Sequence, residues 1–140
     1  GSTASEEPGE DESSQHAGAF LEDDALEVVR LVNDEREKQG LEPLDVDENL
    51  MELARIRAEE LEEKFSHERP DGTHAAQVFS GGENIAGDYT SPSAVMKAWM
   101  GSEGPRANIL RERFHYIGVG CYQDTNGDLY WVQLFSPRKT

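Results

Sequence analysis

The stretch "YIGVGCYQDTNGDLYWVQLF" (residues 116–135) decides the fold class. Its aromatic and β-branched residues predict two strands, over about 117–123 and 129–135. Between them lies Asn126-Gly127, a pair that favours the tight turn of an antiparallel hairpin. The C-terminal part of the chain therefore predicts a β-hairpin, and a sheet must be one layer of the fold.

The segments before this hairpin are helical in pattern. Apolar residues at helical spacing predict helices over 23–39 and 47–65, the second with Asp47 as its N-cap. A third helix is expected to begin at Ser91, because a proline follows in the first helical position, and a short helical turn is expected at 106–110. Helices followed by an antiparallel strand pair predict an α+β fold, with helices packed on a sheet.

The charge is strongly acidic, with a formal net value of −16 over 140 residues. Phosphate binding needs clustered Lys and Arg, and none cluster here, so we expect neither nucleic acid nor an anionic membrane surface as a partner. Every apolar run is too short to span a bilayer, so we expect no transmembrane segment. The composition therefore indicates one domain without a polyanionic partner.

The N-terminal segment differs in composition from the rest. Residues 1–24 contain eight acids and no Lys or Arg, and Ser, Gly and Glu dominate the first 20 residues. This composition predicts an acidic disordered tail or linker over 1–22 and a folded domain over 23–140. The sequence begins with Gly rather than Met, so we expect any signal peptide or anchor to be missing from it.

Two polar residues stand where helical and strand periodicity do not explain them. His67 follows the second predicted helix in "FSHERPDGT", and Glu83 lies between two glycines and apolar Ile85 in "SGGENIAG". Taken singly, each favours a structural role, since a buried acid needs only a partner. Taken together, they are a plausible half-site for a metal ion or an acid–base pair.

Other polar residues have simpler explanations. Arg57, with its neighbours Arg55 and Lys64, is interpreted as a partial partner for glutamates on a solvated face of the second helix. Asn84 and Asn108 are expected to hydrogen-bond loop backbone. The single cysteine, at position 121, excludes an intrachain disulfide and is interpreted as a small buried hydrophobic residue, and Trp99 and Trp131 are interpreted as core aromatics.

Six blocks of the sequence, in this order, resemble the CAP superfamily of cysteine-rich secretory, antigen 5 and pathogenesis-related-1 proteins, also called SCP-like domains. The blocks are "LVNDEREKQGLEPLDVDENLMELARIRAEEL", "FSHERPDG", "GGENIAG", "AWMGSEGPRANIL", "FHYIGVG" and "YWVQLF". The resemblance covers about residues 25–136 and is strongest to the cysteine-poor bacterial branch, whose members are secreted or displayed at the cell surface.

This resemblance implies an α-β-α sandwich, in which helices flank a central, mainly antiparallel sheet. It also implies a cleft that many members line with two histidines and two acids, which can bind zinc or another divalent ion. Carried over residue by residue, the first histidine is His67 and the first acid is Glu83. The second acid falls on Ser102, and the second histidine falls on Pro105.

The change at Pro105 weakens the implied metal site. Zinc sites use at least three protein ligands of the His, Cys or carboxylate type, and only His67 and Glu83 qualify. Proline has no side-chain donor and no backbone N–H. We expect His74 and His115 to lie on the surface, because the family uses neither position, whereas Glu103, beside Ser102, is the acid placed to turn inward.

Three hypotheses for function follow. The domain is a secreted or cell-surface, non-catalytic binding module with a degenerate metal site, which takes a small molecule, lipid or peptide in its cleft. Alternatively, it is a metal-dependent hydrolase with Glu83 as base and His67 as ligand, or a structural surface-display domain tethered by its acidic segment. The first is favoured, because half of the residues that would argue for chemistry are missing.

Overall fold

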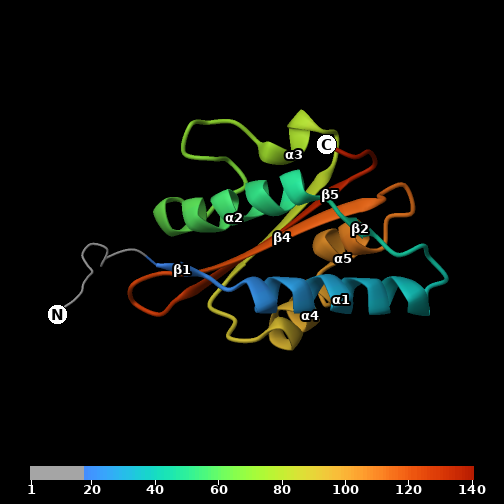
Figure 1. Cartoon of the computed structure of the whole chain (residues 1–140), viewed down its shortest axis with the longest axis horizontal. Coiled ribbons are helices and arrows are strands. Elements are labelled where there is room, and N and C mark those ends of the chain that lie inside the picture. The colour runs from blue at the N-terminus through green and yellow to red at the C-terminus, as the bar shows by residue number, and fades with distance from the viewer. Residues whose placement is uncertain (1–17) are drawn as a thin grey trace.

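The computed structural model describes residues 18–140, and its elements are labelled in Figure 1. In chain order they are β1 (Ala19–Phe20), α1 (Glu22–Lys38), β2 (Asp45–Val46), α2 (Glu48–Glu63), α3 (Ala75–Val78), β3 (Gly82–Gly87), α4 (Pro92–Met100), α5 (Glu103–Ile109), β4 (Tyr116–Gln123) and β5 (Leu129–Ser136).

The predicted hairpin forms the centre of the sheet. β4 and β5 pair antiparallel, and Gly127 completes the turn between them with a φ of +88°. β3 pairs antiparallel with β5 and is an edge strand, while β1 (antiparallel) and β2 (parallel) pair with opposite ends of β4. The sheet is therefore mainly antiparallel, as predicted.

Helices cover both faces of this sheet (Figure 1). On one face, α2 places Leu50, Ala54 and Leu61 against Val132 and Leu134 of β5. On the other face, α1, α4 and α5 share a core with odd-numbered residues of β4. The buried members of that core include Val28, Val32, Val95, Trp99, Ile109, Ile117, Val119 and Trp131. The predicted α-β-α sandwich and the two core tryptophans are confirmed.

α2 lies unusually close to the sheet, because β4 has glycines where its side chains would face the helix. A Cβ atom at Gly118 would overlap the backbone of Leu50, and one at Gly120 would overlap the backbone of Ala54. The helix backbone thus rests directly on the strand. The motif "IGVG" in β4 therefore sets the spacing between these two layers.

Asp47 caps α2, as predicted, and joins it to the C-terminal segment. Its Oδ1 accepts hydrogen bonds from the backbone N–H groups of Asn49 (2.9 Å) and Leu50 (3.3 Å), and its Oδ2 accepts from the N–H (2.7 Å) and hydroxyl (2.9 Å) of Thr140. Burial raises the pKa of Asp47, but these hydrogen bonds outweigh burial and leave the pKa below its usual value. The folded state therefore holds this carboxylate ionised.

The ends of some elements differ from the predicted ones. α2 ends at Glu63, so Phe65, which was expected on its apolar stripe, is 56% exposed. α5 begins at Glu103, before the predicted turn, because Pro105 is compatible with the first turn of a helix. Cys121 is buried, as expected, and burial raises the pKa of its thiol to about 12.

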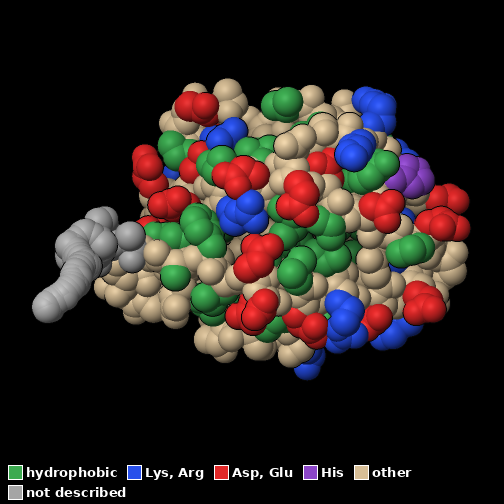
Figure 2. Space-filling view, in the orientation of Figure 1, with side chains coloured by type: hydrophobic (Ala, Val, Ile, Leu, Met, Phe, Trp, Pro, Cys, Tyr) green, Lys and Arg blue, Asp and Glu red, His purple; other side chains and the backbone are tan. Residues whose placement is uncertain are grey.

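Ala19 and Phe20, which precede the boundary predicted at residue 23, pair with β4. Residues 1–17 of the predicted tail lie outside the described residues. Within 18–140, no helix combines the length and the apolar character that a membrane crossing needs. Figure 2 shows acidic side chains spread over both α1 and α2, in keeping with the net charge of −16.

We predict that Gly120→Ala lowers the free energy of unfolding by about 3 kcal/mol, at the upper end of the cost of overpacking, because the obstacle is helix backbone rather than a side chain that can move. Gly104→Ala is the matched control. No atom lies within 4 Å of a Cβ at Gly104, so alanine there leaves stability unchanged or raises it. Urea unfolding of the two variants measures both effects, and equal stabilities would contradict the close packing of α2.

We predict that Asp47→Ala lowers the free energy of unfolding by about 1–2 kcal/mol near neutral pH, the usual value of an N-cap. Because the folded-state pKa of Asp47 is lowered, its stabilisation is complete above the unfolded pKa and is lost as pH falls through the folded one. The difference from wild type therefore narrows in acid. Ser91→Ala removes an uncharged cap from α4 and should cost the same at both pH values in urea unfolding.

Candidate functional site

A cleft opens at the β3 edge of the sheet, between the segment after α2 and helix α5. Its volume is about 380 Å³. It is lined by His67, Glu83, Asn84, Ile85, Gly104, Pro105, Ala107, Asn108 and Arg111, and we call it the His67–Glu83 cleft. A second hollow of about 320 Å³ adjoins it and shares Ile85 and Pro105.

The structure brings the four predicted site residues to this edge. His67, Glu83 and Pro105 line the His67–Glu83 cleft, whereas Ser102 lines the adjoining hollow. Ser102 is exposed and precedes α5 without a side-chain cap hydrogen bond. Glu103 is also exposed and is not part of either lining, so it does not replace the missing acid.

Glu83 is held on both of its carboxylate oxygens. Its Oε2 accepts from Arg57 Nε (2.7 Å), and its Oε1 accepts from Arg57 Nη2 (3.2 Å) and lies 2.8 Å from His67 Nδ1. Only 5% of the side chain is exposed. Burial raises the pKa of Glu83, but the hydrogen bonds from His67 and Arg57 outweigh burial, so the pKa falls below its usual value.

Arg57 is the functional residue that the sequence analysis misplaced. Its side chain is fully buried rather than on a solvated face, and it also bonds Glu60 (3.0 Å) and the carbonyl of Ser66 (2.8 Å). Glu60 in turn accepts two hydrogen bonds from Arg69 (3.0 and 2.8 Å). This network ties the segment after α2 to both α2 and β3. Burial lowers the pKa of Arg57, but the Glu83 and Glu60 carboxylates raise the pKa by more than burial lowers it. The guanidinium therefore stays charged.

A sequence signal for Arg57 exists. The buried positions of α2 include Leu50, Ala54, Arg57, Ala58 and Leu61, which is the spacing of one helical stripe. A charged residue inside an apolar stripe predicts a buried charge, and a buried charge needs a partner. That partner is the carboxylate of Glu83, for which the sequence analysis found no partner.

His67 is oriented by Glu83. Because the Glu83 carboxylate accepts hydrogen bonds only, Nδ1 of His67 carries the proton of their 2.8 Å contact, which leaves Nε2 free. The His67 side chain is 58% exposed, so this second nitrogen is accessible to a ligand. A carboxylate that fixes the tautomer of a histidine in this way prepares the histidine for binding or for proton transfer.

Buried amides tie α5 to β3 behind the cleft. Asn84 Nδ2 donates to Gln133 Oε1 (2.9 Å) and to the carbonyl of Pro105 (3.2 Å), and Asn108 Nδ2 donates to Asn84 Oδ1 (2.9 Å). Asn84 therefore has a backbone partner, as expected, but that carbonyl belongs to helix α5 rather than to a loop. The prediction of a backbone partner is wrong for the side-chain amide of Asn108, whose partner is another side chain. Pro105 thus contributes its carbonyl to the scaffold.

These residues do not fit a tetrahedral zinc ion. His67 offers one free nitrogen, both oxygens of Glu83 are engaged, and Pro105 offers no side-chain donor. His115 is exposed, as expected, His74 is only partly so, and neither lines the cleft. Within residues 18–140, no group of three or more His, Cys, Asp or Glu side chains is arranged to hold a metal.

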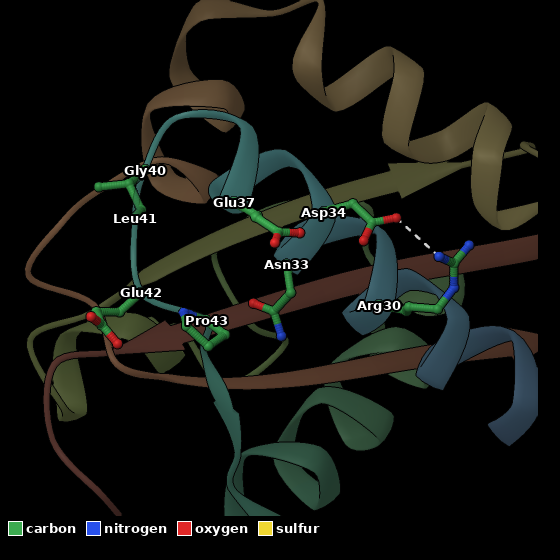
Figure 3. A pocket seen from close by; sticks show the side chains of 8 residues that line it. All are labelled: Arg30, Asn33, Asp34, Glu37, Gly40, Leu41, Glu42 and Pro43. Carbon is green, nitrogen blue, oxygen red and sulfur yellow. Dashed lines mark hydrogen bonds and ion pairs between the residues drawn. The ribbon is translucent and has the colours of Figure 1, made fainter.

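A larger hollow, of about 500 Å³, lies between α1 and the loop at 40–43 (Figure 3). Its lining includes the acids Asp34, Glu37 and Glu42, and Arg30 is paired with Asp34 at 2.9 Å. None of the predicted site residues contributes to it. Its chemistry is therefore that of the acidic surface, in contrast to the His67–Glu83 cleft.

The α-β-α sandwich, with a His–Glu pair in a cleft at a sheet edge, is the arrangement that resemblance to the CAP superfamily implies. Residues 29–135 match the family described as "CAP: Cysteine-rich secretory protein family", so the chain belongs to the CAP family. Two curated Bacillus subtilis proteins are similar in sequence. The uncharacterized protein YkwD is 41% identical over 77% of this chain, and the uncharacterized membrane protein YlbC is 32% identical over 80%.

Solved structures share the fold. An extracellular protein with an SCP domain from Bacillus anthracis matches with a TM-score of 0.75 and 28% identity, over 84% of this chain and 41% of that one. An outer surface protein from Borrelia burgdorferi matches with a TM-score of 0.76 and 22% identity, over 87% and 99%. The chain spans less than half the length of the curated relatives it matches, at 45% of YkwD and 34% of YlbC.

We predict that Arg57→Met destabilises the domain by about 3–5 kcal/mol, because it leaves the Glu83 carboxylate buried without its main partner. The double variant Arg57→Met/Glu83→Leu should lose less than the sum of its single variants, since it removes both charges. Arg55→Met, on the same helix, disrupts only surface pairs and should cost at most about 1 kcal/mol. Urea unfolding tests all four variants, and equal costs for Arg55→Met and Arg57→Met would contradict the buried pair.

Proposed function

We propose that this domain is a secreted or cell-surface, non-catalytic binding module whose ligand occupies the His67–Glu83 cleft. The observation that carries the proposal is the engagement of both Glu83 oxygens by Arg57 and His67, at 2.7–3.2 Å. A carboxylate held in this way shapes and orients a binding surface. Together with a proline at the second histidine position, it makes a degenerate version of the family's metal site.

The proposed location rests on the relatives. Two structural neighbours are an outer surface protein and an extracellular protein. CAP domains of that kind, together with the acidic exterior of this chain, support a place outside the cell or on its surface. A role in surface display, with residues 1–22 as a tether, fits the same location, but it does not explain the cleft.

A hydrolase is the second candidate, and the observation that favours it is the 2.8 Å contact between His67 and Glu83. In this arrangement the general base is the imidazole of His67, oriented by a carboxylate, rather than Glu83 as the sequence analysis expected, because both oxygens of Glu83 are engaged. The adjacent hydroxyl, of Ser66, is engaged as an acceptor for the backbone N–H of Glu68 (3.0 Å). With two metal donors at most in the cleft, this hypothesis has less support than the binding module.

We predict that zinc at micromolar concentration leaves the imidazole signals of His67 unchanged in NMR spectra of the full chain. Pro105→His supplies a second imidazole to the cleft and should make His67 respond at zinc concentrations that leave the unmodified chain unchanged, because two histidines then face one site. The matched control is Pro105→His combined with His67→Gln, which should lose the response again.

A zinc response of His67 in the unmodified chain would favour the second candidate, the hydrolase. If His67 of the unmodified chain shifted at one equivalent of micromolar zinc, the proposal of a dismantled metal site would fail. The hydrolase hypothesis would then be the better one.

A further inference from the structure

The floor of the His67–Glu83 cleft is an open strand edge. The N–H of Asp88 donates to the carbonyl of Leu129 across the β3–β5 pair, which shows that the even-numbered residues of β3 bond to β5. Backbone groups alternate in direction along an antiparallel strand. The backbone N–H and C=O groups of Glu83, Ile85 and Gly87 therefore point away from β5, towards the two hollows that these residues line.

Most of these outward groups have no protein partner. The carbonyl of Ile85 accepts from Trp99 Nε1 at 3.1 Å. Within the part of the chain that the structure describes, no hydrogen bond reaches the outward N–H groups of Glu83, Ile85 and Gly87, or the carbonyls of Glu83 and Gly87. An open edge of this kind offers both donors and acceptors to an extended peptide.

The cleft lacks the excess of acids that the chain has as a whole. Glu83 is the single acid in the linings of the two hollows, and its charge is balanced by Arg57. Arg111 lines the cleft, packs over the Phe114 ring at 5.6 Å, and has no carboxylate partner among the described residues. Although the net charge of the chain is −16, the His67–Glu83 cleft has donors for an anion, in Arg111 and the outward N–H groups of β3. The hollow in Figure 3, by contrast, is lined by three acids.

Aromatic side chains form part of the wall of the adjoining hollow. It is lined by Phe65 and Tyr89, which are 56% and 38% exposed, and by Trp99 and Ile85. Exposed aromatic side chains beside a cleft favour contact with an apolar group of a ligand. The two hollows therefore place donors for an anion next to exposed aromatic side chains.

We propose that the cleft binds the C-terminal end of a peptide. Its terminal carboxylate lies near Arg111 and the N–H groups of Glu83 and Ile85, and an apolar side chain close to that end fills the hollow lined by Phe65 and Trp99. A peptide fits better than an alkyl chain, because its N–H groups satisfy the carbonyls at the strand edge, which hydrocarbon leaves unpaired. The proposal rests on the proposed function, in which this cleft is the binding site.

The test uses an acetylated tetrapeptide, Ala-Ala-Val-Leu, with a free carboxylate, titrated into the ¹⁵N-labelled full chain. We expect the amide signals of Glu83, Ile85 and Gly87 to shift. The same peptide with an amidated C-terminus should bind about tenfold more weakly, because it loses a charge-assisted contact. Isovalerate, a free carboxylate with a similar apolar group, should also bind more weakly than the peptide, because it lacks the peptide backbone.

Two variants assign the carboxylate contact. Arg111→Gln should weaken binding of the free-carboxylate peptide about tenfold and leave the amidated peptide unchanged. Arg113→Gln is the matched control, because Arg113 also lies over the Phe114 ring, at 4.9 Å, but does not line the cleft. Phe65→Ala should weaken both peptides, since it removes an exposed wall of the adjoining hollow.

Three outcomes would overturn the inference: no shift of these amides at millimolar peptide, equal affinity of the two peptides, or isovalerate binding as tightly as the free-carboxylate peptide. A parallel screen of neutral fragments by the same spectra separates this failure from that of the proposed function. Fragment shifts at Glu83 and Ile85 without peptide binding would leave the binding module standing with another ligand. No shifts at the cleft in either experiment would overturn both.

Discussion

The rest of the structure depends on the direct contact between the backbone of α2 and strand β4, at Gly118 and Gly120. The contact leaves no layer of side chains between helix and strand, so a residue on the inner side of α2 is removed from water whether or not it is apolar. Arg57 stands on that side, one turn after Ala54, and is fully buried. Its charge must then be met within the protein, and the acids in reach are Glu83 on β3 and Glu60 on α2. The glycines of β4 thus influence the electrostatics of a cleft at the β3 edge of the sheet.

Burial of this pair is better understood as a means of positioning than as a source of stability. Removing two charges from water costs several kcal/mol for each ion, and their attraction only about repays that cost. What the pair adds is a fixed geometry. Arg57 also holds the carbonyl of Ser66, and so it places the segment that carries His67 while it places the carboxylate that orients His67. An apolar replacement of both charges can preserve the fold, but it leaves His67 without its partner.

Sequence reasoning succeeded where one segment carries its own pattern. The hairpin, the apolar stripe of α2 and its Asp47 cap are local features, and the structure has all three. The strands β1, β2 and β3 were not predicted. β1 and β2 have two residues each, so they show no alternation and are defined by their partner, β4. β3 begins and ends with glycine, which favoured a loop. Arg57 was misplaced for a related reason. A glutamate-rich helix suggests a solvated arginine, and only the depth of the helix in the fold and the position of Glu83 reverse that conclusion. Motifs identified His67 and Glu83, but the residue that holds them lies in a different block of the sequence.

The substitution at Pro105 has a wider effect than the loss of one ligand. Where the resemblance implies a histidine facing His67, this chain has a residue whose carbonyl accepts from Asn84 and whose side chain is inert. With that imidazole absent and the charge of Glu83 balanced by Arg57, the polarity of the cleft is determined by Arg111 and by the outward N–H groups of β3. A site with two histidines and two free acids attracts cations, whereas this set of groups favours an anion. In the proposed binding module, His67 and Glu83 have a role other than metal binding: together with Arg57 they hold in place the wall against which a ligand would lie.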